Sequence, residues 1–165
     1  MTDQATTPDF RDALSRFPAG VTVVTTTEET DEGATPVGFT ASSFCSVSLD
    51  PPLILVCLAR TANCYPVFAG CGCFAVSILT GEHTDLAARF ATKRADKFDG
   101  GAFTATADGL PAVDGALCVL ECATEDVIEA GDHVIMLGRV NGVDLGEGTP
   151  VVYFDRAFHQ LHQLM

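Results

Sequence analysis

Short runs rich in β-branched and aromatic residues follow one another along most of this chain, with few stretches of helical pattern between them. Runs of this kind, bounded by Gly, Pro, Asn and Asp, are typical of β-strands. We expect strands at 21–27, 37–40, 44–49, 53–58, 74–79, 117–123, 126–129, 133–143 and 151–154. Because strand follows strand without an intervening helix, a doubly wound parallel sheet is disfavoured. The pattern predicts a mainly β fold with a few helices, built as a closed or nearly closed antiparallel barrel.

Helical pattern is confined to three short segments. Residues 9–17 would carry Phe10, Leu14 and Phe17 on one face of a helix. A single helical turn is expected at 65–69. The third helix is expected at 84–91, where Thr84 can cap the first turn.

Proline and glycine mark the expected connections. Asp50-Pro51-Pro52 should exclude ladder pairing and force a connection between two strands. Residues 100–115 are rich in Gly and small side chains, so we expect a long loop there. Gly131-Asp132 is a tight-turn signal between two strands.

The length and charge of the chain limit what it can be. A chain of 165 residues suits one domain, which we place at 10–162 after a flexible N-terminus at 1–9. The formal net charge of −13 disfavours binding to nucleic acid and to anionic membranes. No apolar run is long enough to span a bilayer, and the start of the chain lacks the pattern of a secretory signal.

The cysteines point to a reducing compartment. They number seven, an odd count: Cys45, Cys57, Cys64, Cys71, Cys73, Cys118 and Cys122. Most of them lie in apolar runs, where cysteine behaves as a small hydrophobic residue. Their spacings match no zinc ligand set. We therefore expect free thiols, no metal site and a cytoplasmic protein.

The most informative stretch is GFTASSFCSVSLDPPL, residues 38–53. Thr40, Ser42 and Ser43 place three hydroxyl groups beside Gly38 and Ala41, whose small size lets the backbone approach a ligand closely. Such a group suits a phosphate or the polar edge of a heterocycle. A solvent-exposed Ser/Thr turn explains the composition equally well. The chain has no Gly-x-Gly-x-x-Gly after a strand, so a Rossmann dinucleotide site is disfavoured.

Several blocks together resemble a known family. They are residues 38–53, residues 57–66, Arg89-Phe90-Ala91 with Asp96-Lys97-Phe98, Gly131-Asp132-His133, and residues 152–156. In this order and spacing they look like the short-chain flavin reductases, NAD(P)H:flavin oxidoreductases that are the small components of two-component monooxygenases. The resemblance runs from about Phe10 to Leu161, and the TASSF–SVSLDPPL block and the Gly-Asp-His triplet are its specific parts.

The resemblance implies a fold, an activity and partners. The fold would be an FMN-binding split barrel, a Greek-key-like antiparallel β-barrel, in a homodimer with the flavin near the subunit interface. The activity would be reduction of free or loosely bound FAD or FMN by NADH or NADPH. The reduced flavin would pass to a separate flavin-dependent monooxygenase.

The resemblance also implies site residues. Those lining the isoalloxazine and the ribityl chain would be Pro36, Val37, Thr40, Ala41, Ser42 and Ser43. Those holding the ribityl phosphate would be Cys57, Leu58 and Ala59 at a strand end, with Asn63 and Cys64 in the following turn. Further cofactor-binding residues would be Arg89, Phe90, Ala91, Lys97, Phe98 and Phe154. The family usually has Ser-x-Thr where this chain has Ala62-Asn63-Cys64, so two phosphate-binding hydroxyls are missing here.

A basic cluster, Arg89, Lys93, Arg94 and Lys97, has two interpretations. It could be a solvated helix end whose cations complement the helix dipole. Alternatively, some of its members neutralise the flavin phosphate or pyrophosphate. The family match at Phe90 and Lys97 favours the second interpretation.

Among the four histidines, His133 is the candidate catalytic residue. It follows a tight turn, at the position where the family's histidine faces the flavin and the nicotinamide. We expect His83 to be exposed or capping, and His159 and His162 to lie at the surface.

Two rival functions stay open. One is a non-catalytic flavin or haem carrier on the same barrel. The other is an oxidase similar to pyridoxamine-phosphate oxidase, which would need a set of cations for the substrate phosphate that the sequence does not supply.

Overall fold

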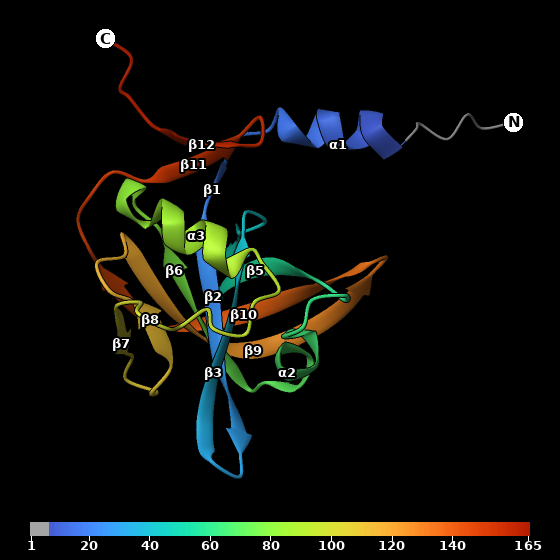
Figure 1. The fold of residues 1–165 in the computed structure, drawn as a ribbon, viewed down its shortest axis with the longest axis vertical. Coiled ribbons are helices and arrows are strands. Elements are labelled where there is room, and N and C mark those ends of the chain that lie inside the picture. The colour runs from blue at the N-terminus through green and yellow to red at the C-terminus, as the bar shows by residue number, and fades with distance from the viewer. Residues whose placement is uncertain (1–6) are drawn as a thin grey trace, which may run out of the picture.

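Residues 7–165 are described by a computed structural model (Figure 1). The helices are α1 (Thr7–Ser15), α2 (Tyr65–Gly70) and α3 (Thr84–Phe90), with a 3₁₀ turn, η1 (Gly81–His83), before α3. The strands of the main sheet are β2 (Thr22–Thr30), β3 (Gly33–Ala41), β4 (Cys45–Leu49), β5 (Pro52–Ala59), β6 (Cys73–Ile78), β9 (Cys118–Ala130) and β10 (His133–Leu145). The remaining strands are β1 (Ala19–Gly20), β7 (Phe103–Ala105), β8 (Pro111–Val113), β11 (Val151–Phe154) and β12 (Ala157–Gln160).

The main sheet is antiparallel throughout, in the order β3-β2-β6-β9-β10-β5-β4. A second sheet pairs β1 with β11 and β11 with β12, and β7 and β8 form a separate hairpin. This arrangement confirms a mainly β fold with few helices. The hydrogen-bonded order of the main sheet ends at β3 on one side and at β4 on the other, so the pairing itself forms no closed ring.

Hydrophobic residues fill both faces of the main sheet. On β2, Val24 belongs to a core cluster with Phe39, Phe68 and Met136, while the adjacent Val23 faces a second cluster. That second cluster contains Leu86, Ala87 and Phe90 of α3 together with Val151 of β11. Successive side chains of a strand point to opposite faces, which explains why neighbouring valines serve different cores.

Four expectations about local structure were wrong. The segments at 117–123 and 126–129 form one strand, β9, because β10 pairs with it along its whole length across two bulges. The expected loop at 100–115 contains the β7–β8 hairpin. Pro52 pairs with Leu49 and begins β5, since a missing N–H is tolerated at the first residue of a strand. Thr84 does not cap α3.

The start of α3 is shaped by a different residue pair. Thr80 and His83 form a capping box around η1, and the Thr80 backbone N–H donates to His83 Nδ1 at 3.2 Å. We expected His83 to be either exposed or a capping residue, and the structure shows that it caps. His159 lies on β12, where its Nε2 is 3.0 Å from the carbonyl oxygen of Phe154.

Helix α1 lies at the edge of the molecule, beside β12 (Figure 1). Phe10, Leu14 and Phe17 leave 60%, 58% and 76% of their surface exposed, so this apolar group is uncovered in the single chain. The flexible segment expected at 1–9 falls largely outside the described residues. No helix in the described part of the chain is both long and apolar enough to cross a bilayer.

A close approach of backbone to side chain joins α3 to β3. A Cβ on Gly38 would lie 2.9 Å from Cε1 of Phe90 and 2.9 Å from the backbone oxygen of Val24. Contacts this short force the neighbouring atoms to move, and neither Phe90, which is 1% exposed, nor a strand backbone can move freely. Residue 38 therefore has to be glycine for α3 to lie where it does.

We expect Gly38→Ala to lower the free energy of unfolding by about 1–3 kcal/mol, the usual cost of overpacking a core. Urea denaturation monitored by circular dichroism would measure the loss. Gly70→Ala is the matched control, because a Cβ there meets nothing within 4 Å. Equal stability of Gly38→Ala and the wild type would contradict the close packing of α3 on β3.

Candidate functional site

Strand β3 and helix α3 are also joined by a polar contact. The hydroxyl of Thr40 donates to the carbonyl oxygen of Ala87 at 2.6 Å. This bond uses the Thr40 hydroxyl within the fold, while the residue still lines a cavity. Thr40 can therefore contact a ligand in the cavity, but its hydroxyl proton is already used in the bond to Ala87.

Strands β5 and β10 bring His133 to the same place. His133 pairs with Ala59 in the antiparallel register, at the open end of both strands. Gly131 has a φ of +65°, a left-handed conformation that glycine adopts readily, and this closes the turn before His133. The Arg60 N–H donates to the carbonyl oxygen of Asp132 at 2.9 Å, which ties the turn to the end of β5.

The imidazole of His133 is held by its neighbour. Its Nδ1 lies 2.7 Å from Oδ1 of Asp132, and the His133 side chain is 46% exposed. This hydrogen bond lowers the pKa of the Asp132 carboxyl from its ordinary value. Because Nδ1 is engaged, Nε2 is the nitrogen left for another partner.

A cavity of about 280 Å³ opens between these elements, and we call it the central cavity. It collects residues from five separate stretches of the chain. Its walls are Phe39, Thr40, Cys57, Leu58, Ala59, Thr61, Ala62, Asn63, Cys64, Phe90, Ala91, Thr92, Lys93, Lys97 and His133. Most of the residues implied by the family resemblance thus meet in one place.

A second cavity of about 230 Å³ adjoins the first through Asn63, Cys64, Lys93 and Lys97, and we call it the cationic cavity. Its other walls are Glu28, Pro36, Val37, Gly38, Val67, Arg94, Ala95 and Phe98. The expected site residues Pro36, Val37 and Phe98 lie here and not around the central cavity. The two cavities share the cations that an anionic ligand would need.

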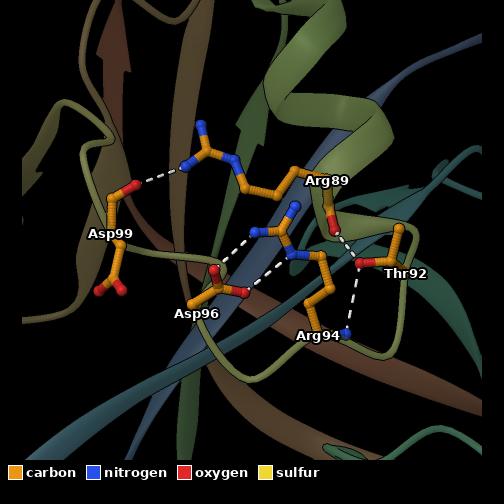
Figure 2. A network of polar contacts seen from close by, with 5 residues as sticks. All are labelled: Arg89, Thr92, Arg94, Asp96 and Asp99. Atoms are coloured by element: carbon orange, nitrogen blue, oxygen red, sulfur yellow. Dashed lines mark hydrogen bonds and ion pairs between the residues drawn. The ribbon is translucent and has the colours of Figure 1, made fainter.

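The basic cluster divides into two kinds of residue. Figure 2 shows Arg94 paired with Asp96 through two bonds of 2.8 and 2.6 Å, and Arg89 donating to the carbonyl oxygen of Asp99 at 2.6 Å. The pairing lowers the pKa of the Asp96 carboxyl. Thr92 completes the network, since its hydroxyl donates to the carbonyl oxygen of Arg89 at 2.7 Å. The two arginines therefore hold the loop after α3.

Lys97 is placed differently. Its Nζ donates to the carbonyl oxygens of Gly38 and Phe90, both at 3.2 Å, and lies 5.9 Å from the centre of the Phe90 ring. Burial lowers the pKa of this ammonium group from its ordinary value. Among the side chains described, at 10–165, Lys97 forms no ion pair. A half-buried cation without a counter-charge favours an anionic ligand in the cavity.

The turn that lacks the family's hydroxyls has another internal role. Asn63 Nδ2 donates to the carbonyl oxygen of Lys93 at 3.2 Å and so links the turn after β5 to the loop after α3. Cys64 is buried, and burial raises the pKa of its thiol although the nearby Lys97 opposes this. A phosphate in this turn would therefore have to be bound by backbone N–H groups and by lysine.

Some expected site residues lie outside both cavities. Ala41 is buried in the core, and Ser43 receives the Cys57 backbone N–H at 2.8 Å, which fixes the end of β5. Arg89 serves the loop, and the Phe154 ring lies against His159 on β12. Ser42 lines two further cavities on the side of β11 and β12.

Three lining residues of the central cavity were not named as site residues from the sequence: Phe39, Thr61 and Thr92. Phe39 and Thr61 lie inside the family-like segments 38–53 and 57–66, and Thr92 directly follows Ala91, but a lone threonine in a loop does not stand out. The position of Phe39 in the sequence predicts a core residue, and Phe39 does belong to the hydrophobic core. Only the folding of β3 against α3 brings it to the cavity wall.

The central and cationic cavities fit a flavin. Apolar walls accept a flat ring, and lysines between the two cavities can take a phosphate. Hydride transfer requires contact and orientation of two rings and no side-chain nucleophile. Within the described residues, no group of three or more His, Cys, Asp or Glu side chains is arranged to hold a metal ion.

Comparison with known proteins supports this assignment. The family model "Flavin reductase like domain" matches residues 14–162. An actinorhodin polyketide dimerase of Streptomyces coelicolor is 58% identical over 153 residues, 92% of this chain and 85% of that protein. A flavin-dependent monooxygenase reductase subunit of Rhodococcus jostii is 36% identical over 88% of this chain and 73% of its own length.

A solved structure of a related flavin oxidoreductase has the same fold as this chain. The NADH:FAD oxidoreductase of Streptomyces globisporus, in complex with NAD and FAD fragments, superposes with a TM-score of 0.89 at 33% identity, covering 98% of this chain and 96% of that one. The chain belongs to the flavin reductase family.

The thiols next to and beneath the site should differ sharply in reactivity. All seven cysteines are free; Cys45 is exposed, whereas burial raises the pKa of the Cys122 thiol to about 12. Only the thiolate reacts with disulfide reagents, so at pH 8 we expect Cys45 to react first and Cys122 to stay unreactive until unfolding. Titration with a chromogenic disulfide, followed by peptide mapping, would test this. Fewer than seven thiols in the unfolded, non-reduced chain would contradict it.

Proposed function

We propose that this protein uses NADH to reduce FAD or FMN and supplies the reduced flavin to a separate flavin-dependent monooxygenase. The observation that carries the proposal is that His133, the end of β5 and Lys97 meet around one cavity, with no ion pair to Lys97 among the described side chains. Membership of the flavin reductase family supports both the activity and the partner. The structure of the Streptomyces globisporus oxidoreductase, in complex with NAD and FAD fragments, supports the two ligands.

The residues around the cavity divide the work. When bound, the flavin supplies the ring that accepts hydride, so the protein has only to bind, orient and exclude water. Lys97 and Lys93 neutralise the phosphate, and Cys57, Leu58 and Ala59 form the wall at the end of β5. His133 donates or accepts a hydrogen bond through Nε2 and holds the nicotinamide in place. A flavin held by two lysines and few hydroxyls would leave readily, as delivery to a second enzyme requires.

The carrier hypothesis makes a different prediction from the reductase. A carrier would bind flavin but leave NADH unoxidised, whereas a reductase consumes NADH in proportion to added flavin. Steady-state absorbance of NADH, with FAD and FMN supplied separately, decides between them. Flavin binding without NADH consumption would contradict the proposed activity.

The proposal includes a split barrel over 10–162, a homodimer and a cytoplasmic location. Ser43 supports the barrel, because it links the segment after β3 to β5 through the Cys57 backbone. The uncovered apolar face of α1 supports a second copy as its cover. Seven free thiols support a reducing compartment. Sedimentation that shows only a species of 17.3 kDa would contradict the dimer.

His133→Ala should reduce kcat/KM for NADH by about five- to 150-fold, the effect of losing one positioning hydrogen bond of about 1–3 kcal/mol. Flavin affinity should barely change, since the phosphate is held by lysines elsewhere in the cavity. Steady-state kinetics, flavin titration and a thermal melt on the same variant measure these effects. His162→Ala is the matched control, as His162 is exposed near the C-terminus. Unchanged NADH kinetics, or a parallel loss of both ligands with a lower Tm, would refute the role.

A further inference from the structure

An arginine at the wall of the cationic cavity is already bound by a carboxylate. Arg94 lines this cavity together with Lys93 and Lys97. Its Nε and Nη2 groups donate to the two oxygens of Asp96 at 2.8 and 2.6 Å (Figure 2). Glu28 is the acidic residue of the same wall, and among the described side chains it pairs with none of these cations. Within the same set of side chains, Arg94 is thus the one cation of this wall that has a carboxylate partner.

The carboxylate of Asp96 takes a position that suits a phosphate equally well. The Nε–H and Nη2–H groups form one edge of the guanidinium, and such an edge binds carboxylates and phosphates through two parallel bonds. These bonds raise the pKa of the Arg94 guanidinium and lower the pKa of the Asp96 carboxyl, so both groups stay charged. A phosphate that enters the cavity therefore meets an arginine that is already neutralised.

The ion pair can open at little cost. The side chains of Arg94 and Asp96 are 59% and 46% exposed. Exposed pairs contribute little to stability, because water competes for both partners and two flexible side chains have to be ordered. A phosphate monoester carries up to two negative charges and three acceptor oxygens, so it can displace a single carboxylate from an arginine. Because Asp96 follows Arg94 by only two residues, the pair can form again when the phosphate leaves.

The loop after α3 has further bonds that do not use the Asp96 carboxylate. Arg89 Nη1 donates to the carbonyl oxygen of Asp99 at 2.6 Å, and the Asp99 backbone N–H donates to the carbonyl oxygen of Asp96 at 3.2 Å. The ammonium group of Lys97 is held by backbone oxygens of β3 and α3. Loss of the Asp96 carboxylate should consequently change the ligand site more than the fold.

We propose that Asp96 competes with the flavin phosphate for Arg94 and so keeps the flavin weakly bound. The inference rests on the proposed function, because it takes the ligand to be a flavin whose phosphate lies beside Lys97. Two anions that compete for one cation each lower the affinity of the site for the other. Weak binding suits an enzyme that has to give its reduced flavin to a second protein. Asp96 is a positioning residue in this scheme, since it acts on the ligand through Arg94.

Fluorescence titration of the flavin-free protein with FMN and with riboflavin measures this competition without any turnover. We expect Asp96→Asn to bind FMN about three- to tenfold more tightly, the effect of freeing one charged donor group, and to bind riboflavin as the wild type does. Asp96→Ala should show the same gain. Asp99→Asn is the matched control for charge, because Asp99 is exposed on the same loop and forms no ion pair among the described side chains.

A second substitution tests whether the effect acts through Arg94. In an Arg94→Met background, Asp96→Asn has no guanidinium to release, so its gain should shrink to that of Asp99→Asn. The Tm of Asp96→Asn should stay close to that of the wild type, as the other bonds of the loop remain.

The outcomes separate competition from its alternatives. A gain in FMN affinity that requires Arg94 and is absent for riboflavin supports the proposal. Weaker FMN binding by Asp96→Asn would show that Asp96 orients Arg94, and an equal gain in Asp99→Asn would show an effect of net charge alone; either result overturns the proposal. A wild type that binds neither FMN nor riboflavin refutes the proposed function and this inference with it. Wild-type consumption of NADH with added FMN, together with unchanged FMN affinity in Asp96→Asn, overturns this inference alone.

Discussion

The contact between α3 and β3 determines how the site is built. Gly38 lets the Phe90 ring lie against the strand, the Thr40 hydroxyl binds the helix backbone, and Lys97 bridges Gly38 and Phe90 through their carbonyl oxygens. The central and cationic cavities both use residues of β3, and the central cavity also uses Phe90 of α3. A side chain at residue 38 would separate the two elements and change every wall.

The few basic residues of the chain have distinct roles around the site. The chain carries 22 acidic and nine basic residues, so each cation matters. Arg89 and Arg94 hold the loop after α3 (Figure 2). The same loop carries Lys93 and Lys97, which lie between the two cavities. The two arginines are bound within the loop, and Arg94 also lines the cationic cavity, whereas Lys93 and Lys97 line both cavities, as the proposed ligand site requires.

Much of the fold follows from patterns that are local in sequence. Strands at β2, β3, β5, β6 and β10 have periodic apolar residues and clear turns, and they occur close to where they were expected. The β7–β8 hairpin could not be predicted, because its strands are three residues long in a stretch of small residues, and only packing on the core selects them. Residues 118–130 form the single strand β9 because they pair with β10 across two bulges. Such pairing involves residues distant in sequence and cannot be read from a local pattern.

The site was predictable where a motif carried it. His133 of the Gly-Asp-His triplet and the end of β5 line the central cavity, where the family resemblance places site residues. The sequence does not show whether some polar side chains bind a ligand or the backbone. This applies to the hydroxyl of Ser43, the guanidinium of Arg89 and the amide of Asn63, each of which can form hydrogen bonds with either. The fold gives all three to the backbone.

We infer that Lys97 lies at the phosphate end of a flavin bound in the central cavity. Fluorescence titration of wild type and Lys97→Met with FMN and with riboflavin, which lacks the phosphate, tests it most directly. We expect Lys97→Met to weaken FMN binding by about tenfold or more and to leave riboflavin binding nearly unchanged. Arg16→Met controls for net charge. Equal FMN affinity in both proteins, or the same loss for FMN and riboflavin, would show that Lys97 does not bind the phosphate.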